Sequence, residues 1–465
     1  MRRDQLSTQA THHTDHTGQS YDRSKLFWAS VLALVTAGFA FSIRGAIISD
    51  LQKAFFDPFD AANATALVGG ATGSAFLGFA LSIFVGSPLC DYLGMGRLLA
   101  LSAILLAVGT VATILVPPSA GVYWTLWATF FITGLGHGMV EAVINPLIAT
   151  IYPEDKTHRL NVLHAWWPGG LIMGGLIAFF MGASNISWKI QLAMVLIPAA
   201  ITLFLTIGLK FPPTERVAAG VSSGDMMKAA FNPLFLVLLF CMLFTASSEL
   251  APGQWVNSML TRLVGFQGIL LLVYVSGLMF VMRHFAGSLA HRLSPIGLMW
   301  VSCLLAAIGL YMLGSATSPV TGLVAATVWG VGVCYMWPTM LGITSERFPR
   351  GGALSLGLMG CFGNIAIYFM LPYLGSVFDK AKQAAAVTAG TTFDAIKNLP
   401  DTDPVMKPIL SEASKVAFHT VALFPAGLLV VFGLWWLWDK SRGGYKAERL
   451  DQLEHIDSAP TPVNV

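Results

Sequence analysis

Charge is scarce in this 465-residue sequence, in which only 11% of the residues are Asp, Glu, Lys or Arg. Soluble domains carry about 25% charged residues, so a deficit along the whole chain excludes a soluble enzyme, a nucleic-acid-binding protein and a disordered scaffold. Hydrophobic residues make up 55% of the chain instead, with 13 Trp and 30 Phe. This composition predicts an all-α polytopic membrane protein whose surroundings are the lipid bilayer.

Cysteine is scarce as well, and the five cysteines stand singly in or at the ends of apolar stretches. They form no C-x-x-C pair and no metal-ligand spacing, so we interpret them as small buried apolar side chains. The sequence also lacks a G-x-x-x-x-G-K loop and an H-E-x-x-H motif. We therefore expect no enzyme, no cofactor and no metal site, and an energy source in ion or solute gradients.

Long apolar runs dominate the sequence, and a helix needs about 20 mostly apolar residues to cross a bilayer. We predict twelve spans, at 27–48, 65–86, 98–115, 123–150, 161–182, 189–209, 232–255, 269–290, 296–314, 319–345, 352–375 and 417–438. The expected organisation is a tail at 1–26, a six-helix bundle at 27–209, a linker at 210–231, a six-helix bundle at 232–438 with a long loop at 376–416, and a tail at 439–465.

Positive charge is distributed unequally between the two sets of alternating connections. The side that holds both tails carries 17 of the 27 Lys and Arg residues, the other side carries eight, and Arg44 and Arg283 fall inside spans. Cytoplasmic loops carry an excess of Lys and Arg. We therefore expect both termini in the cytoplasm, the 376–416 loop outside it, and a plasma membrane or bacterial inner membrane as the location.

The two halves of the chain look like copies of each other. Span four contains Gly134-Leu-Gly136, and span ten contains Gly330-Val-Gly332 at an offset of 196 residues. The same offset relates Tyr152-Pro153 to Phe348-Pro349. Duplicated bundles are common in transporters whose halves rock about a central site. The duplication predicts a site between the halves.

These features resemble the major facilitator superfamily over about residues 27–438. Beside the six plus six helices, a turn follows the second helix of each half, as Ser87-Pro-Leu-Cys-Asp91-Tyr-Leu-Gly94 and Gly287-Ser-Leu-Ala-His291-Arg292-Leu. The resemblance implies two pseudo-symmetric six-helix bundles. It also implies that this turn latches the cytoplasmic side, with Asp91, Arg97 and Arg292 as latch residues.

Several segments are more specifically similar to the fucose, glucose and galactose permease group. They are Glu141-Ala-Val-Ile-Asn145-Pro146 in span four, Leu160-Asn161-Val-Leu-His164 in span five, Glu249 with Gly253-Gln254-Trp255 in span seven, and Trp337-Pro338-Thr339 in span ten. The resemblance implies a monomeric symporter that moves a hexose or a similar polyhydroxylated small molecule by alternating access.

Ionisable side chains inside the spans are the candidates for ion coupling, because each costs about 2.5 to 3.5 kcal/mol at the bilayer centre unless it is paired or hydrated. In one interpretation, Glu141, Arg44 and His164 line a midplane cavity and couple transport to an ion. In the other, Arg44 and Glu141 form a permanent ion pair between the first and fourth helices. Asn145, one turn from Glu141 on the same face, adds an amide that would suit Na⁺. H⁺, Na⁺ and uncoupled diffusion all stay open.

Sugar recognition needs hydrogen-bond partners for hydroxyl groups and a flat aromatic face. Such residues lie near helix interruptions at Pro252-Gly253 and Pro168-Gly169-Gly170. The predicted substrate-binding residues are Asn145, Asn161, Trp166, Glu249, Gln254, Trp255, Asn257, Trp337 and Asn364. Arg283, one turn before a loop, is interpreted as a snorkelling or latch residue outside the site.

Two alternatives to a sugar transporter stay open. Arg44, the many Met residues and the Trp-rich fifth span also suit an exporter of an amphiphilic, lipid-like or drug-like solute. The latch turns depart from the family pattern, with Ser87 and Tyr92 in place of the usual Gly and Arg and His291 in place of the acid. These departures and the 376–416 loop suit a non-transporting membrane partner or sensor.

Overall fold

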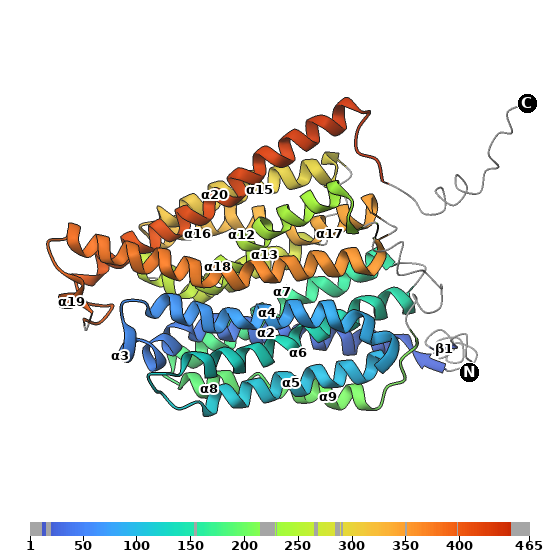
Figure 1. The fold of residues 1–465 in the computed structure, drawn as a ribbon, viewed down its shortest axis with the longest axis horizontal. Helices are drawn as coiled ribbons and strands as arrows, with labels where there is room; N and C mark the ends of the chain where they lie inside the picture. Colours follow the sequence, from blue (N-terminus) through green and yellow to red (C-terminus); the bar gives the residue numbers. More distant parts are fainter. Residues whose placement is uncertain are drawn as a thin grey trace, which may run out of the picture.

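Long apolar helices make up most of the chain, because in a bilayer each backbone N–H and C=O must find its hydrogen bond within the protein. The computed structural model describes residues 12–14, 20–152, 156–213, 228, 230–264, 268–283, 289, 292–348, 351–397 and 399–447. The helices run roughly along one direction (Figure 1). The first long helix, α2 (Arg23–Phe55), begins at the same end of the helix bundle at which the last one, α20 (Met406–Ser441), finishes (Figure 1). We call this end the terminal end, and the opposite end, with α3 (Asp57–Asp60) and α19 (Phe393–Ile396), the far end.

The described residues of the N-terminal half form a short hairpin and eight helices. They are β1 (His12–Thr14), β2 (Ser20–Asp22), α2 (Arg23–Phe55), α3 (Asp57–Asp60), α4 (Ala64–Leu93), α5 (Met95–Leu115), α6 (Tyr123–Ile151), α7 (Lys156–Ala183), α8 (Trp188–Ala193) and α9 (Leu196–Ile207). The two strands are antiparallel, with His12 opposite Asp22. Asp22 then caps α2 by accepting a hydrogen bond from the backbone N–H of Lys25.

The C-terminal half repeats the pattern of long helices. Its elements are α12 (Pro233–Val264), α13 (Gly268–Arg283), α15 (Pro295–Gly314), α16 (Pro319–Val333), α17 (Met336–Arg347), α18 (Gly352–Thr388), α19 (Phe393–Ile396) and α20 (Met406–Ser441). Within the described part of the chain, eleven helical stretches are long and apolar enough to cross a membrane, with α8–α9 and α16–α17 each counting as one. The shorter apolar helix α13 stands at the predicted eighth span. The prediction of an all-α, polytopic twelve-helix architecture is confirmed.

The predicted loop at 376–416 is largely wrong. Helix α18 continues to Thr388 and α20 begins at Met406, so most of this segment is helical. The apolar residues Phe378, Ala386, Met406 and Leu410 are at most 2% exposed. A hydropathy window detects helices that are apolar on all sides because lipid surrounds them. These helix ends pack against each other on one face and carry polar residues on the other, so the window does not detect them.

Among the described helices, the two halves meet mainly along three pairs: α4 with α18, which lie side by side in Figure 1, α7 with α13, and α2 with α12. Glycine allows the closest of these approaches. A Cβ atom added to Gly375 would stand 2.5 Å from the Thr65 carbonyl oxygen, and one added to Gly69 would stand 2.7 Å from that of Leu371. Small residues of this kind let helix backbones pack closely in membranes.

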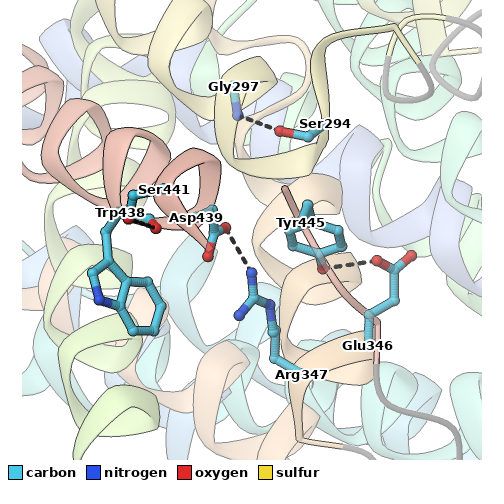
Figure 2. A network of polar contacts seen from close by, with 8 residues as sticks. All are labelled: Ser294, Gly297, Glu346, Arg347, Trp438, Asp439, Ser441 and Tyr445. Atoms are coloured by element: carbon cyan, nitrogen blue, oxygen red, sulfur yellow. Dashed lines mark hydrogen bonds and ion pairs between the residues drawn. The ribbon is translucent and has the colours of Figure 1, made fainter. Parts of the chain in front are cut away.

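A polar network holds α20 to the rest of the C-terminal half at the terminal end (Figure 2). Arg347 of α17 pairs with Asp439 of α20 at 2.6 Å, and the Tyr445 hydroxyl donates to Glu346 at 2.8 Å. The Arg347 guanidinium also lies 4.5 Å from the centre of the Tyr445 ring. Burial and the neighbouring Glu346 carboxylate raise the pKa of Tyr445 above its ordinary value. Tyr445 therefore keeps the proton that it donates to Glu346.

Candidate functional site

The interruption of α12 is satisfied by a neighbouring helix. Pro252 has no N–H, so the Ser248 carbonyl one turn earlier loses its helical hydrogen bond. Trp329 of α16 fills this vacancy, because its Nε1 donates to the Ser248 oxygen at 3.1 Å. The carbonyl that the proline frees thus fixes α16 against α12.

The break between α16 and α17 supplies a second carbonyl that accepts a hydrogen bond from a neighbouring helix. Arg283 of α13 donates through Nε to the Cys334 oxygen at 3.2 Å, and its Nη2 lies 3.4 Å from Oε1 of Glu249. The side chains of Arg283 and Glu249 are only 11% and 8% exposed. The other carboxylate oxygen of Glu249 has no hydrogen-bond partner among the described residues. This places a charged pair with spare acceptor capacity inside the C-terminal half.

The position of Arg283 corrects its interpretation as a snorkelling or latch residue. A snorkelling arginine extends toward water, whereas this one turns inward to a carboxylate and a freed carbonyl. The signal was present in the sequence, since Arg283 falls inside a predicted span. Only the fold shows that Glu249 lies within its reach.

A chain of polar contacts joins α6 and α7 in the N-terminal half. Asn145 donates through Nδ2 to Oε2 of Glu141 at 2.9 Å and to the Glu141 backbone oxygen at 3.1 Å. Its Oδ1 lies 2.9 Å from Nε2 of His164. All three side chains are partly buried. The structure therefore brings together three residues that the sequence predicts for the site.

The two polar groups face each other across the boundary between the halves. His164 interacts electrostatically with Glu141 of its own half and with Arg283 of the other half. Trp166, half a turn beyond His164, packs edge-on against Phe280 of α13 with ring centres 5.9 Å apart. We define the central site as Glu141, Asn145 and His164 together with Glu249 and Arg283.

Arg44 does not pair with Glu141, so the interpretation of a permanent ion pair between the first and fourth helices is wrong. Its Nε donates to Oε1 of Gln254 at 2.8 Å. Arg44 lies 21 residues into α2, whereas Glu141 lies ten residues from the last residue of α6, and both of these helix ends are at the terminal end. With a rise of 1.5 Å per residue, the depths are about 30 Å and about 15 Å. The two charges therefore stand at different levels.

Other predicted residues lie deeper in the packing of the C-terminal half. Trp255 is 2% exposed, and Asn364 is 1% exposed and donates to the Gly360 oxygen at 2.8 Å. The Trp337 ring lies against Gly363, and its backbone lies beside Glu249. Trp337 therefore borders the Glu249 side of the central site.

Several predicted residues remain without structural description. The side chains of Asn161, Asn257 and the latch residue Asp91 lie outside the described part of the chain. The other two predicted latch residues, Arg97 and Arg292, are exposed. In the part of the chain that the structure covers, no three His, Cys, Asp or Glu side chains gather where they would hold a metal ion.

Comparison with known proteins identifies the family of this chain. The family model of the Major Facilitator Superfamily matches residues 25–371. A D-xylose transporter of Levilactobacillus brevis is 30% identical over 166 residues, which is 35% of this chain and 34% of that protein. Myo-inositol transporter 1 of Candida albicans is 29% identical over 162 residues, which is 34% of this chain and 27% of that protein. The matches thus span about a third of these curated relatives.

Among solved structures, the xylose transporter XylE from E. coli in a partially occluded inward-open conformation is similar with a TM-score of 0.68. The likeness covers 88% of this chain and 99% of that one, at 14% sequence identity. At this identity it shows a shared fold. Because the family model matches residues 25–371, which is most of the chain, the chain belongs to the Major Facilitator Superfamily and is a multi-pass membrane protein of this transporter family rather than an enzyme.

Proposed function

We propose that this protein is a proton-coupled secondary active transporter of a hexose or a similarly small polyhydroxylated solute. The observation that carries the proposal is the hydrogen-bonded chain of Glu141, Asn145 and His164, which faces Glu249 and Arg283 across the boundary between the halves. Sugar transporters among the relatives, for xylose and for myo-inositol, support the same class of solute.

The chemistry of the central site suits hydroxyl groups. Carboxylates accept hydrogen bonds from sugar hydroxyls, and the Asn145 and His164 side chains offer both donors and acceptors. Trp166 and Trp337 border the site on its two sides and supply aromatic faces for the apolar surface of a sugar ring. A solute held by both groups would bridge the two halves.

Alternating access requires contacts between the halves that break and re-form. At the far end, the Asp379 carboxylate of α18 accepts from the backbone N–H of Ala66 at 3.0 Å, and Gln383 donates to the Ala62 oxygen at 3.4 Å. The first contact joins α18 to the first turn of α4, and the second joins α18 to the turn that precedes α4. They form a set that could separate without disrupting either half.

The orientation of the Asn145 amide favours a proton over Na⁺ as the coupling ion. Na⁺ needs several oxygen ligands at one point, but Asn145 presents its N–H group to Glu141 and its oxygen to His164. A carboxylate that faces an amide N–H and a nearby imidazole is instead arranged to exchange a proton. Glu141 and His164 are the proposed coupling residues.

The test is uptake of labelled glucose, galactose, fucose and xylose into proteoliposomes under an imposed proton gradient or an imposed sodium gradient. We expect accumulation of at least one sugar under the proton gradient alone. Glu412→Gln is the matched control, because Glu412 is an exposed residue of α20 that pairs with Lys415. Accumulation under the sodium gradient alone would overturn the coupling assignment. No uptake of any sugar by folded protein would overturn the substrate class and favour an exporter of amphiphiles.

A further inference from the structure

A small polar cavity lies within the N-terminal half, apart from the central site. Its walls come from α2, α5, α6, α8 and the turn after α8, and its polar lining residues are Arg44, Thr110, Thr113, Thr133 and His137. Phe130 and Leu192 are among the apolar lining residues. The cavity has room for about one water molecule. The lining residues that the structure describes all belong to the N-terminal half, so the cavity is separate from the central site between the halves.

Arg44 brings a positive charge to this cavity without a carboxylate to balance it. The side chain is 3% exposed, and its Nε donates to the neutral amide of Gln254. The guanidinium also lies 4.9 Å from the ring centre of Phe76 and 5.5 Å from that of Phe41. None of the described residues that line the cavity is acidic. An ionised group buried in this way is normally paired or bound to a counter-ion.

Two further groups make the cavity suitable for a negative ion. His137 is 3% exposed, and its Nε2 has no hydrogen-bond partner among the described residues. Thr110, 2% exposed, contributes a hydroxyl that can donate. A guanidinium, an imidazole and a hydroxyl therefore converge on one small volume, and each of them can donate a hydrogen bond.

We propose that this cavity binds a single halide-sized anion, chloride under physiological conditions, between Arg44, His137 and Thr110. Charge selects an anion, because the polar lining offers donors and a buried cation. Size selects a monatomic ion, because a space for about one water cannot hold a phosphate or the carboxylate of an acidic sugar. The proposal does not depend on the identity of the transported solute.

The anion would also act on the contact between the halves. One side of the guanidinium faces the cavity, and its Nε meets Gln254 of α12. An anion bound on the cavity side would hold the guanidinium in place. It would thereby also hold the Arg44 Nε–H group that donates to Gln254. Halide binding is therefore expected to stabilise the arrangement in which α2 and α12 are joined.

The experiment measures thermal unfolding of the purified protein in detergent as sodium gluconate is replaced by sodium chloride or sodium bromide at constant ionic strength. We expect the melting temperature to rise with halide and to saturate. His137→Leu and Thr110→Val should each weaken halide binding, so that the half-saturating halide concentration rises at least tenfold. Thr72→Val is the matched control, because Thr72 is an equally buried threonine of α4 whose hydroxyl bonds to the Val68 oxygen; it should leave the halide response unchanged.

A second measurement keeps the proposal falsifiable if the variants fold poorly. Crystals of the unmodified protein grown in bromide should show one anomalous scattering peak between Arg44 and His137. A melting temperature independent of halide, or a bromide structure without a peak in this cavity, would overturn the proposal and leave water as the occupant. An equal halide response in the parent and in both cavity variants would place the halide elsewhere and would also overturn it.

Discussion

The Nε atom of Arg44 donates a 2.8 Å hydrogen bond to Oε1 of Gln254, and this bond joins α2 of the N-terminal half to α12 of the C-terminal half. Gln254 is fully buried, and its Nε2 donates in turn to the Phe41 oxygen at 3.2 Å. The amide of Gln254 thus serves α2 twice, through a side chain and through the backbone.

Replacing Gln254 with leucine should destabilise the protein, because the guanidinium donor and the Phe41 carbonyl would both stay buried without this partner. Hydrogen bonds to charged groups contribute about 1.5 to 3 kcal/mol, and we expect a loss of this order in thermal unfolding. Gln254→Glu should retain most of the stability, because a carboxylate still accepts from Arg44. Equal stability of the leucine and glutamate variants would contradict the assigned contact.

Removing one partner of the Glu249 and Arg283 pair should cost more than removing both. Arg283→Met leaves a buried carboxylate without its cation, and breaking such pairs costs about 3 to 5 kcal/mol. The double variant Arg283→Met with Glu249→Gln removes the charge as well, so part of the loss should be recovered. A thermal-unfolding double-mutant cycle measures the coupling. Strictly additive effects would show that the two side chains do not interact.

The Trp329 contact offers a test by rescue. Trp329→Phe removes the donor to the Ser248 oxygen and should cost about 1 to 3 kcal/mol, because a buried carbonyl is left unsatisfied. Pro252→Ala restores the backbone N–H that bonds this carbonyl in a regular helix. The double variant should therefore be more stable than Trp329→Phe alone. A further loss on adding Pro252→Ala would contradict the account.

Asp379 should hold the far end of the two halves together. Its carboxylate caps α4 through the Ala66 N–H, and removing such a cap costs about 1 kcal/mol, which is about fivefold in the equilibrium toward separation. Spin labels attached at Phe59→Cys on α3 and Asp394→Cys on α19 report the distance between the two halves at the far end by electron paramagnetic resonance. The five native cysteines are buried, so the labels should react at the two introduced cysteines.

We expect Asp379→Ala to increase the population with a long distance between these labels. Asp403→Ala is the control, because that carboxylate accepts from the backbone of Val405 in its own turn. The same distance distribution in the parent and in Asp379→Ala would show that the contact does not hold the far end closed.

The sequence predicts well those features that depend on local pattern. The helices follow from apolar runs, and the contact between Glu141 and Asn145 follows from one-turn spacing on α6. The C-terminal end of α18 and the N-terminal end of α20 were not predicted as helix, because their mean hydropathy is that of a polar loop. Their apolar residues, such as Phe378 and Leu410, are buried by protein packing rather than by lipid. The partners of Arg44 and Arg283 were missed for a different reason. They are set by the depth at which separate helices cross, between the halves for Arg44 and within the C-terminal half for Arg283, and no local pattern encodes that depth.

The most direct test of the central claim is proton-driven accumulation of sugar by Glu141→Gln in proteoliposomes. The fold should survive, because a glutamine can still accept the Asn145 hydrogen bond. We predict that accumulation is lost while exchange of labelled for unlabelled sugar remains measurable, because the variant can bind and rock but cannot release a proton. Accumulation equal to that of the parent protein would contradict the coupling role of Glu141.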